Sequence, residues 1–217
     1  PVGNCEYSDI TVFSFHPVKI ITTAEGGMAT TRQKELATRM QLYRSHGITR
    51  DPELMTHQPD GAWYYQQIEL GYNYRMTDLQ AALGLSQMDK LDVFIKQRHA
   101  IANRYNTLLA DLPVTRPYQH ADTYSALHLY IIRLQLNQIS IDHVTVFDRM
   151  RANGIGVNLH YIPIHLQPYY QRLGFKKGDF PNAEKFYSEA ISIPMYSSLS
   201  PQQQDQVLHA LRQSLSK

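Results

Sequence analysis

The stretch from Leu79 to about Leu109 contains no proline and places apolar residues at helical intervals. That pattern predicts one long helix, or two joined helices, in the middle of the chain. Pro113 and Pro117 then end it, because proline cannot continue a helix. We therefore predict two domains: a first domain over residues 1–112 that includes the long helix, and a small C-terminal domain over residues 113–217.

The segments before the long helix alternate between strand and helix patterns. Residues 10–15, ITVFSF, predict a buried strand, and residues 33–45 carry apolar side chains at helical spacing. Gly47 is expected to end that helix. Residues 47–72 hold prolines, glycines and tyrosines without a period, which predicts a long, structured loop. This order of elements predicts an α/β fold.

The segments after the long helix predict a smaller mixed domain. Strand patterns cover residues 124–134 and 157–160, and helix patterns cover residues near 141–153 and 202–215. These elements predict an α+β fold for the second domain.

The composition excludes several classes of protein. With 43% hydrophobic and 18% charged residues among 217, the chain has enough apolar material for a core. A net charge of +2 gives no strong field for nucleic acid, and no apolar run approaches the ~20 residues of a membrane helix. The single cysteine, Cys5, cannot form an internal disulfide, so a cytoplasmic protein is expected. The sequence opens with PVGNCEYSD, without a methionine, and looks like part of a longer protein.

Lys19 is the first candidate for chemistry. It follows Pro17 and is flanked by Val18, Ile20 and Ile21, an apolar setting that is unusual for lysine. Burial would lower its pKa, and a neutral lysine amine attacks carbonyl groups to form Schiff bases. The alternative is an ordinary lysine that extends its amine into solvent, and position alone favours this alternative.

The residues around Lys19 favour the reactive lysine over the solvent-exposed one. The segment from Asp9 to Thr30, with SFHPVK followed by TTAEGG, resembles the lysine-bearing stretch of the DegT/DnrJ family of pyridoxal-phosphate-dependent nucleotide-sugar aminotransferases. Three later runs resemble the same family in the same order: GYNYRMTDLQAALG at 71–84, HYIPIH at 160–165 and ISIPMY at 191–196. The resemblance covers essentially the whole chain.

The resemblance implies fold type I of the pyridoxal-phosphate-dependent transferases, the aspartate-aminotransferase-like fold. Enzymes of this type begin with a large domain that supplies an acidic residue to the pyridine nitrogen, a ring that stacks on the cofactor, and further phosphate donors. None of these precedes Lys19 here, so the chain is expected to lack the N-terminal part of the large domain. Without that acid the cofactor is a poor electron sink, and we expect the 217 residues alone to bind it loosely and not to turn over.

The resemblance also implies three cofactor-binding residues. Lys19 is the lysine that holds pyridoxal phosphate covalently, and Ser14 binds its phosphate. Asn73 resembles the asparagine that reaches the phosphate from the partner subunit, which implies a homodimer. The alternatives are an ordinary strand hydroxyl for Ser14 and a residue of a helix-entry loop for Asn73.

Four residues are candidates for the substrate side: Arg75, His160, Tyr161 and His165. Arg75 can pair bidentately with a phosphate or carboxylate, and its alternative is a solvated arginine. The stretch with the two histidines lies near the sugar pocket in the family, and ordinary packed side chains are the alternative for each. No cysteine or carboxylate cluster stands nearby in the sequence to complete a metal site, so no metal is expected.

Together these roles imply transfer of an amino group from glutamate to C4 of a UDP-4-keto-6-deoxy-N-acetylhexosamine. Within the family, the runs SFHPVK, HYIPIHLQPYY and GFKKGDFPNAE resemble enzymes of pseudaminic acid biosynthesis. Lysine at position 19 favours transamination, because a family member with histidine there would be a dehydratase. The rival hypothesis is a non-catalytic fragment of such an enzyme that self-associates through apolar faces.

Overall fold

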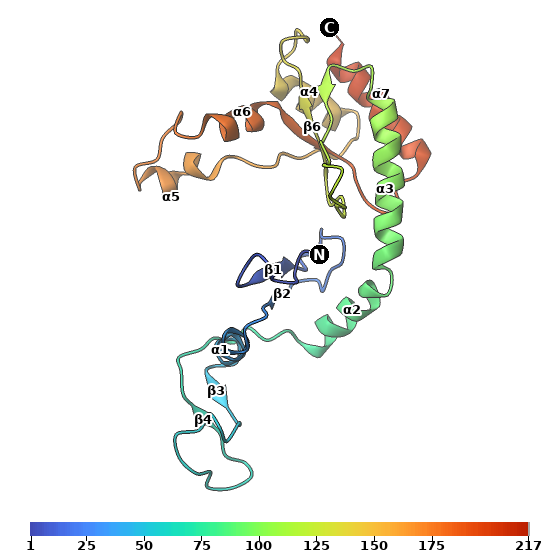
Figure 1. The fold of residues 1–217 in the computed structure, drawn as a ribbon. Helices are drawn as coiled ribbons and strands as arrows, with labels where there is room; N and C mark the ends of the chain where they lie inside the picture. The colour runs from blue at the N-terminus through green and yellow to red at the C-terminus, as the bar shows by residue number, and fades with distance from the viewer. Residues whose placement is uncertain (217) are drawn as a thin grey trace. The chain divides into compact units, whose positions relative to one another are not determined.

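The proline-free stretch in the middle of the chain forms two joined helices, one of the two predicted outcomes. In the computed structural model, which describes residues 1–216, α2 spans Asp78–Met88 and α3 spans Leu91–Leu108 (Figure 1). Thr77 begins α2 with a capping box. Its hydroxyl accepts the backbone N–H of Gln80, and the side chain of Gln80 accepts the N–H of Thr77.

The chain divides into two compact units after Leu91. α3 belongs with the second unit because its buried side chains, Ile101 and Tyr105 among them, pack into the core of that unit. The predicted boundary between residues 112 and 113 instead assigns this helix to the first domain. That boundary concerns the domains of a complete enzyme, and it stays a prediction.

β1 (Thr11–Ser14) and β2 (Gly27–Thr30) form a two-stranded antiparallel pair in the first unit. The strand predicted over residues 10–15 is therefore confirmed in position, but the expectation that it is buried is wrong. Its side chains alternate between half-buried and exposed, and Val12 is 76% exposed. Two strands alone supply no layer that could cover both faces of β1.

α1 (Lys34–Arg44) confirms the predicted helix, and Gly47 follows its end in the left-handed conformation, with a φ of 68°. The loop predicted over residues 47–72 contains one short antiparallel strand pair, β3 (Ile48–Thr49) with β4 (Gln66–Gln67). The remainder of that segment is irregular.

The second unit is built on an antiparallel sheet with the strand order β5-β6-β7. The strands are β5 (Val114–Thr115), β6 (Tyr130–Leu134) and β7 (Ala190–Ile193). The helical segments described after α3 are α4 (His143–Ala152), the 3-10 helix η1 (Ile164–Leu166), α5 (Pro168–Gln171), α6 (Pro181–Glu189) and α7 (Pro201–Leu215). This is the mixed α+β arrangement predicted for the second domain.

The hydrophobic core lies in the second unit. Tyr130, Ile132 and Leu134 alternate inward along β6 and are at most 1% exposed. The buried apolar side chains of the described chain lie between Ile101 and Leu211, and none lies in the first unit. Because burial of apolar surface is the main source of stability, the second unit holds most of it.

α7 and α3 lie side by side in the second unit (Figure 1). Ser200 caps the start of α7 through a capping box, and Pro201 occupies its first turn, which confirms the helix predicted over residues 202–215. The buried side chain of Gln204 donates to the carbonyl oxygen of Ile101 at 3.0 Å. This bond fixes the register of the two helices.

The strand predicted over residues 157–160 is wrong. Only Asn158 joins the sheet in this segment, by a single antiparallel bridge to Ser192 of β7. The strand predicted over 124–134 begins only at Tyr130, because Arg98 takes the carbonyl oxygens of Leu127 and His128 that a longer ladder would need. Each of those two bonds is 3.1 Å long.

Candidate active site

Lys19 lies in a closed loop between β1 and β2. The backbone N–H of Phe15 donates to the carbonyl oxygen of Gly26 at 2.9 Å, and the N–H of Thr23 donates to the carbonyl oxygen of Phe15 at 3.0 Å. Inside the loop, the N–H of Lys19 donates to the carbonyl oxygen of His16 at 2.9 Å. These bonds fix the backbone of Lys19, whose side chain is half-buried.

Two threonines that the sequence analysis did not single out hold this loop closed. The hydroxyl of Thr22 donates to the carbonyl oxygen of Phe15 at 3.0 Å and accepts the N–H of Ala24 at 3.0 Å. Thr23 is 3% exposed, and its hydroxyl donates to the carbonyl oxygen of Glu25 at 2.8 Å. The signal that could have found them is the run TTAEGG, since a polar pair directly after an apolar lysine segment needs internal partners.

Ser14 is the last residue of β1 and lies opposite Gly27, at the mouth of the same loop. Its hydroxyl oxygen accepts the backbone N–H of His16 at 3.4 Å, so its proton stays available for another acceptor. The side chain is exposed. The structure thus brings Ser14 and Lys19 into one loop.

Asn73 and Arg75 lie in an extended segment that is bonded to the end of α1. The N–H of Tyr72 donates to the carbonyl oxygen of Tyr43 at 2.6 Å, and Asn73 forms an antiparallel bridge with Ser45. The rings of Tyr72 and Tyr74 stack at 4.9 Å, so they share one side of the segment. Because side chains alternate in extended chain, Asn73 and Arg75 belong to the other side, and both are exposed.

Two close approaches join the Lys19 loop to the segment that follows Asn73. A Cβ added at Gly26 would meet the Cε of Met76 at 2.9 Å, and one added at Gly84 of α2 would meet the Cγ2 of Thr23 at 2.8 Å. The first unit therefore packs this loop, the Asn73 segment and α2 against one another.

The other three predicted residues lie in the second unit. The Nδ1 of half-buried His160 is 2.6 Å from the hydroxyl of Ser192, and Tyr161 next to it is 69% exposed. His165 is buried, and its Nε2 lies 2.8 Å from the Oε1 of Glu184. Residues 1–216 contain no group of three His, Cys, Asp or Glu side chains placed to share a metal ion, and no helix there is long and apolar enough to cross a membrane.

Glu184 bonds to the predicted residue His165 and was not singled out by the sequence analysis. The side chain of His165 and the backbone N–H of Gly178 donate to it, at 2.8 and 2.7 Å. These two bonds hold the pKa of Glu184 below its ordinary value, since they favour the carboxylate. Nineteen positions separate Glu184 from His165, so no short sequence motif could predict that the two side chains are bonded.

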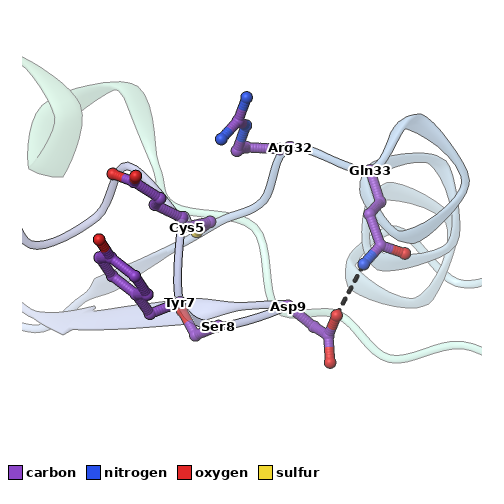
Figure 2. A pocket seen from close by; sticks show the side chains of 7 residues that line it. Cys5, Tyr7, Ser8, Asp9, Arg32 and Gln33 are labelled. Carbon is purple, nitrogen blue, oxygen red and sulfur yellow. Dashed lines mark hydrogen bonds between the residues drawn. The ribbon is translucent and has the colours of Figure 1, made fainter.

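A cavity of about 410 Å³ lies beside Cys5, and none of the predicted site residues lines it (Figure 2). The hydroxyls of Thr11 and Thr30 bond to the Cys5 thiol, which lowers its pKa. Figure 2 shows the side chain of Gln33 reaching Asp9, to which it donates at 2.7 Å. This bond ties the start of β1 to the start of α1.

The Lys19 loop fits two ends of pyridoxal phosphate. A primary amine on a fixed backbone suits the aldehyde, and the free hydroxyl proton of Ser14 suits a phosphate oxygen. The carboxylate in this loop, Glu25, lies 3.8 Å from His16 and is exposed. The donors of the loop would therefore suit the aldehyde and phosphate ends of the cofactor rather than its pyridine nitrogen.

Comparison with known sequences identifies the family of the chain. A model described as the DegT/DnrJ/EryC1/StrS aminotransferase family matches residues 1–212. The spore coat polysaccharide biosynthesis protein SpsC of Bacillus subtilis is 38% identical over 207 residues, which are 94% of this chain and 53% of that protein. The UDP-4-amino-4,6-dideoxy-N-acetyl-beta-L-altrosamine transaminase of Campylobacter jejuni is 35% identical over 194 residues, 89% of this chain and 49% of that protein.

Solved structures show the same fold. Helicobacter pylori PseC, an aminotransferase involved in the biosynthesis of pseudoaminic acid, matches with a TM-score of 0.86 at 30% identity, over 96% of this chain and 54% of that one. The pyridoxal-phosphate form of Spr1654, a putative sugar aminotransferase from Streptococcus pneumoniae, matches with a TM-score of 0.83 at 30% identity, over 98% and 54%. The chain spans about half the length of the curated relatives that it matches.

Proposed function

The chain belongs to the DegT/DnrJ/EryC1/StrS aminotransferase family, and on this basis we propose that it supplies the lysine-bearing part of a nucleotide-sugar aminotransferase. Its fold is that of the corresponding part of fold type I pyridoxal-phosphate-dependent transferases. The observation that carries the proposal is the hydrogen-bonded loop that contains Lys19 and begins at Ser14.

Lys19 and Ser14 act at opposite ends of the cofactor in this proposal. Pyridoxal phosphate, when bound, withdraws electrons from the carbon that loses or gains a proton. Lys19 would hold the cofactor covalently through its aldehyde, and as a free amine it would move the proton at the substrate carbon. Ser14 donates its hydroxyl proton to the phosphate and holds the cofactor in place.

Asn73 reaches the phosphate from the partner subunit, so the active form is a homodimer. Its exposed position on one side of the extended segment supports this role. Arg75, on the same side, pairs with a phosphate or carboxylate of the substrate. His160, Tyr161 and His165 belong to the sugar side of the site, where the exposed ring of Tyr161 supports a contact role.

We propose that the amino group passes from glutamate to C4 of a UDP-4-keto-6-deoxy-N-acetylhexosamine, in a cytoplasmic step of polysaccharide biosynthesis of the pseudaminic acid type. The keto acid of the donor and the 4-amino sugar are the products. The names of the Campylobacter jejuni and Helicobacter pylori relatives support this substrate class. Because few side chains discriminate two sugars that differ in few contacts, comparing kcat/KM for different UDP-4-keto sugars tests this substrate class.

Borohydride trapping tests whether Lys19 is the residue that binds pyridoxal phosphate covalently. The chain, and the same chain extended to the full length of its relatives, are incubated with pyridoxal phosphate, reduced and digested. Mass analysis should place the pyridoxyl group on Lys19. Lys19→Arg should keep the fold and lose both the label and transamination with glutamate, because guanidinium stays protonated. A label on another lysine, with Lys19 free, would contradict the assignment.

A second candidate is a non-catalytic fragment that self-associates, and the surface of the first unit favours it. None of the apolar side chains in residues 1–91 is buried, and Val12, Leu70 and Leu79 are 76%, 86% and 86% exposed. Exposed apolar surface of this kind drives association. Colourless protein that forms large oligomers in light scattering supports this candidate, whereas a yellow protein with cofactor on Lys19 supports the enzyme.

A further inference from the structure

The segment from Asn158 to His165 is anchored to the sheet at its first end. The N–H of Asn158 donates to the carbonyl oxygen of Ser192 at 3.2 Å, and the N–H of Ser192 donates back at 2.8 Å. The hydroxyl of Ser192, which is 6% exposed, lies 2.6 Å from the Nδ1 of His160. The imidazole of His160 is therefore hydrogen-bonded to β7 of the sheet.

His165 and Glu184 anchor the second end. Their side chains are 7% and 16% exposed, and the Nε2 to Oε1 distance is 2.8 Å. The same carboxylate oxygen accepts the backbone N–H of Gly178 at 2.7 Å, and the ring of Phe180 lies 4.8 Å from the ring of His165. One carboxylate thus joins η1, the loop before α6 and α6 itself, which together extend away from β6 (Figure 1).

Three of the four side chains between His160 and His165 are exposed, whereas Pro163 is buried. Tyr161 is 69% exposed, Ile162 is 47% exposed and Ile164 is 64% exposed. The two histidines turn inward to partners, and the aromatic ring between them is presented to solvent. A buried histidine whose Nε2 already bonds to a carboxylate is poorly placed to touch a substrate.

We propose that His165 and Glu184 are positioning residues that hold the segment 160–165 so that Tyr161 contacts the nucleotide sugar. The proposal rests on the function proposed above and revises one part of it: His165 acts through the segment rather than on the substrate. An aromatic ring held on a fixed backbone contacts a sugar or base at low entropic cost, whereas the same ring on a loose segment must be ordered at each binding event. The loss should therefore fall on affinity for the sugar.

Four variants test the pair in the protein extended to the length of its relatives. His165→Ala and Glu184→Ala should each raise KM for the UDP-4-keto sugar about tenfold, because misplaced binding groups cost affinity and alignment. The half reaction with glutamate, followed by the cofactor absorbance, should stay within about twofold of the original rate. His165→Gln and Glu184→Gln keep a donor and an acceptor, and should recover most of the sugar affinity.

Hydrogen–deuterium exchange supplies a readout that does not need activity. In the 217-residue chain, His165→Ala should speed exchange of peptides from residues 158–167 and 174–180 and leave β6 unchanged. His143→Ala is the matched control, since it also removes a histidine bond to this unit, the 2.9 Å bond of Nε2 to the carbonyl oxygen of Ala190. It should leave the sugar KM and exchange of residues 158–167 unchanged.

The outcomes separate the two proposals. If the extended protein without substitutions shows no transamination, the proposed function is overturned, while hydrogen–deuterium exchange in the 217-residue chain still tests the anchoring. Unchanged sugar KM in His165→Ala, or a slowed glutamate half reaction, overturns the positioning role. Exchange that speeds across the whole second unit overturns it as well, because the pair would then stabilise the fold in general.

Discussion

Thr23 donates its backbone N–H to the carbonyl oxygen of Phe15 at 3.0 Å, and this bond closes the loop that carries Lys19. The threonine is 3% exposed, and its Cγ2 lies against the position of Gly84 in α2. The backbone of the loop that carries Lys19 is therefore held by a buried threonine four positions further along the chain.

Thr23→Val tests this relationship. Valine keeps the shape but removes the hydroxyl that donates to the carbonyl oxygen of Glu25, so the loop should lose about 1 kcal/mol of local stability. Exchange of peptides within residues 15–26 should speed, and trapping of cofactor on Lys19 should fall. Thr107→Val is the control, because its hydroxyl also donates to a carbonyl oxygen, but at an exposed position of α3, where water replaces the bond. Equal effects of both variants would contradict the role of Thr23.

Gly47→Ala should disrupt the Asn73 segment. Gly47 has a φ of 68°, and an added Cβ would collide with the backbone carbonyl of Glu69. We expect a loss of more than about 1 kcal/mol, together with faster exchange of residues 68–74. Gly156→Ala is the control, because a Cβ there meets nothing within 4 Å. An unchanged exchange pattern in Gly47→Ala would show that the segment does not depend on this close approach.

The helices could be predicted from the sequence because their signals are local. The apolar spacing across residues 79–109 and the Ser-Pro start of α7 each lie within a few residues of the element they specify. The short strands could not be predicted as well, since pairing partners are distant. Asn158 forms its bridge with Ser192 of β7, which is 34 positions away. Arg98 donates to the carbonyl oxygens of Leu127 and His128, which would otherwise be available to extend β6.

The residues of the candidate site also fall into those that a local motif predicts and those that depend on the fold. Lys19 and Ser14 are five positions apart and share one recognisable run, so the sequence was enough to pair them. Thr23 stands close by but carries no reactive group, and its importance appears only when its burial is known. The contact of Glu184 with His165 forms only when the loop before α6 and α6 itself pack against η1. No residue pattern near His165 predicts that packing.

Mixed dimers test the proposal that Asn73 acts on the partner's cofactor. Lys19→Ala and Asn73→Ala, each made in the protein extended to the length of its relatives, should be inactive alone. Mixed subunits should recover one working site per dimer, because one interface then pairs an intact Lys19 with an intact Asn73. The measurement is transamination after subunit exchange, with heterodimers confirmed by mass. Heterodimers that form and stay inactive would place both residues of a site in one chain, whereas an active Asn73→Ala variant would show that Asn73 is dispensable.

The pH dependence of the His165 and Glu184 anchor has a definite sign. The pKa of Glu184 is lowered in the folded protein because the side chain of His165 and then the N–H of Gly178 donate to its carboxylate. A lowered folded-state pKa means that the carboxylate stabilises the fold fully above the ordinary glutamate value of 4.5. That contribution is lost as pH falls from there through the folded-state pKa.

The amide of Gly178 reports this loss directly, since it donates to the same carboxylate at 2.7 Å. Its protection factor, corrected for intrinsic exchange, should be constant above the ordinary glutamate pKa and fall below it. In Glu184→Gln the fall should vanish, because the amide oxygen accepts without titrating. The Thr145 amide, held by the Asp142 carboxylate at the start of α4, should still lose protection in acid, since the pKa of Asp142 is also lowered by that bond. A Gly178 amide that loses protection equally in both proteins would mean that another group controls this loop.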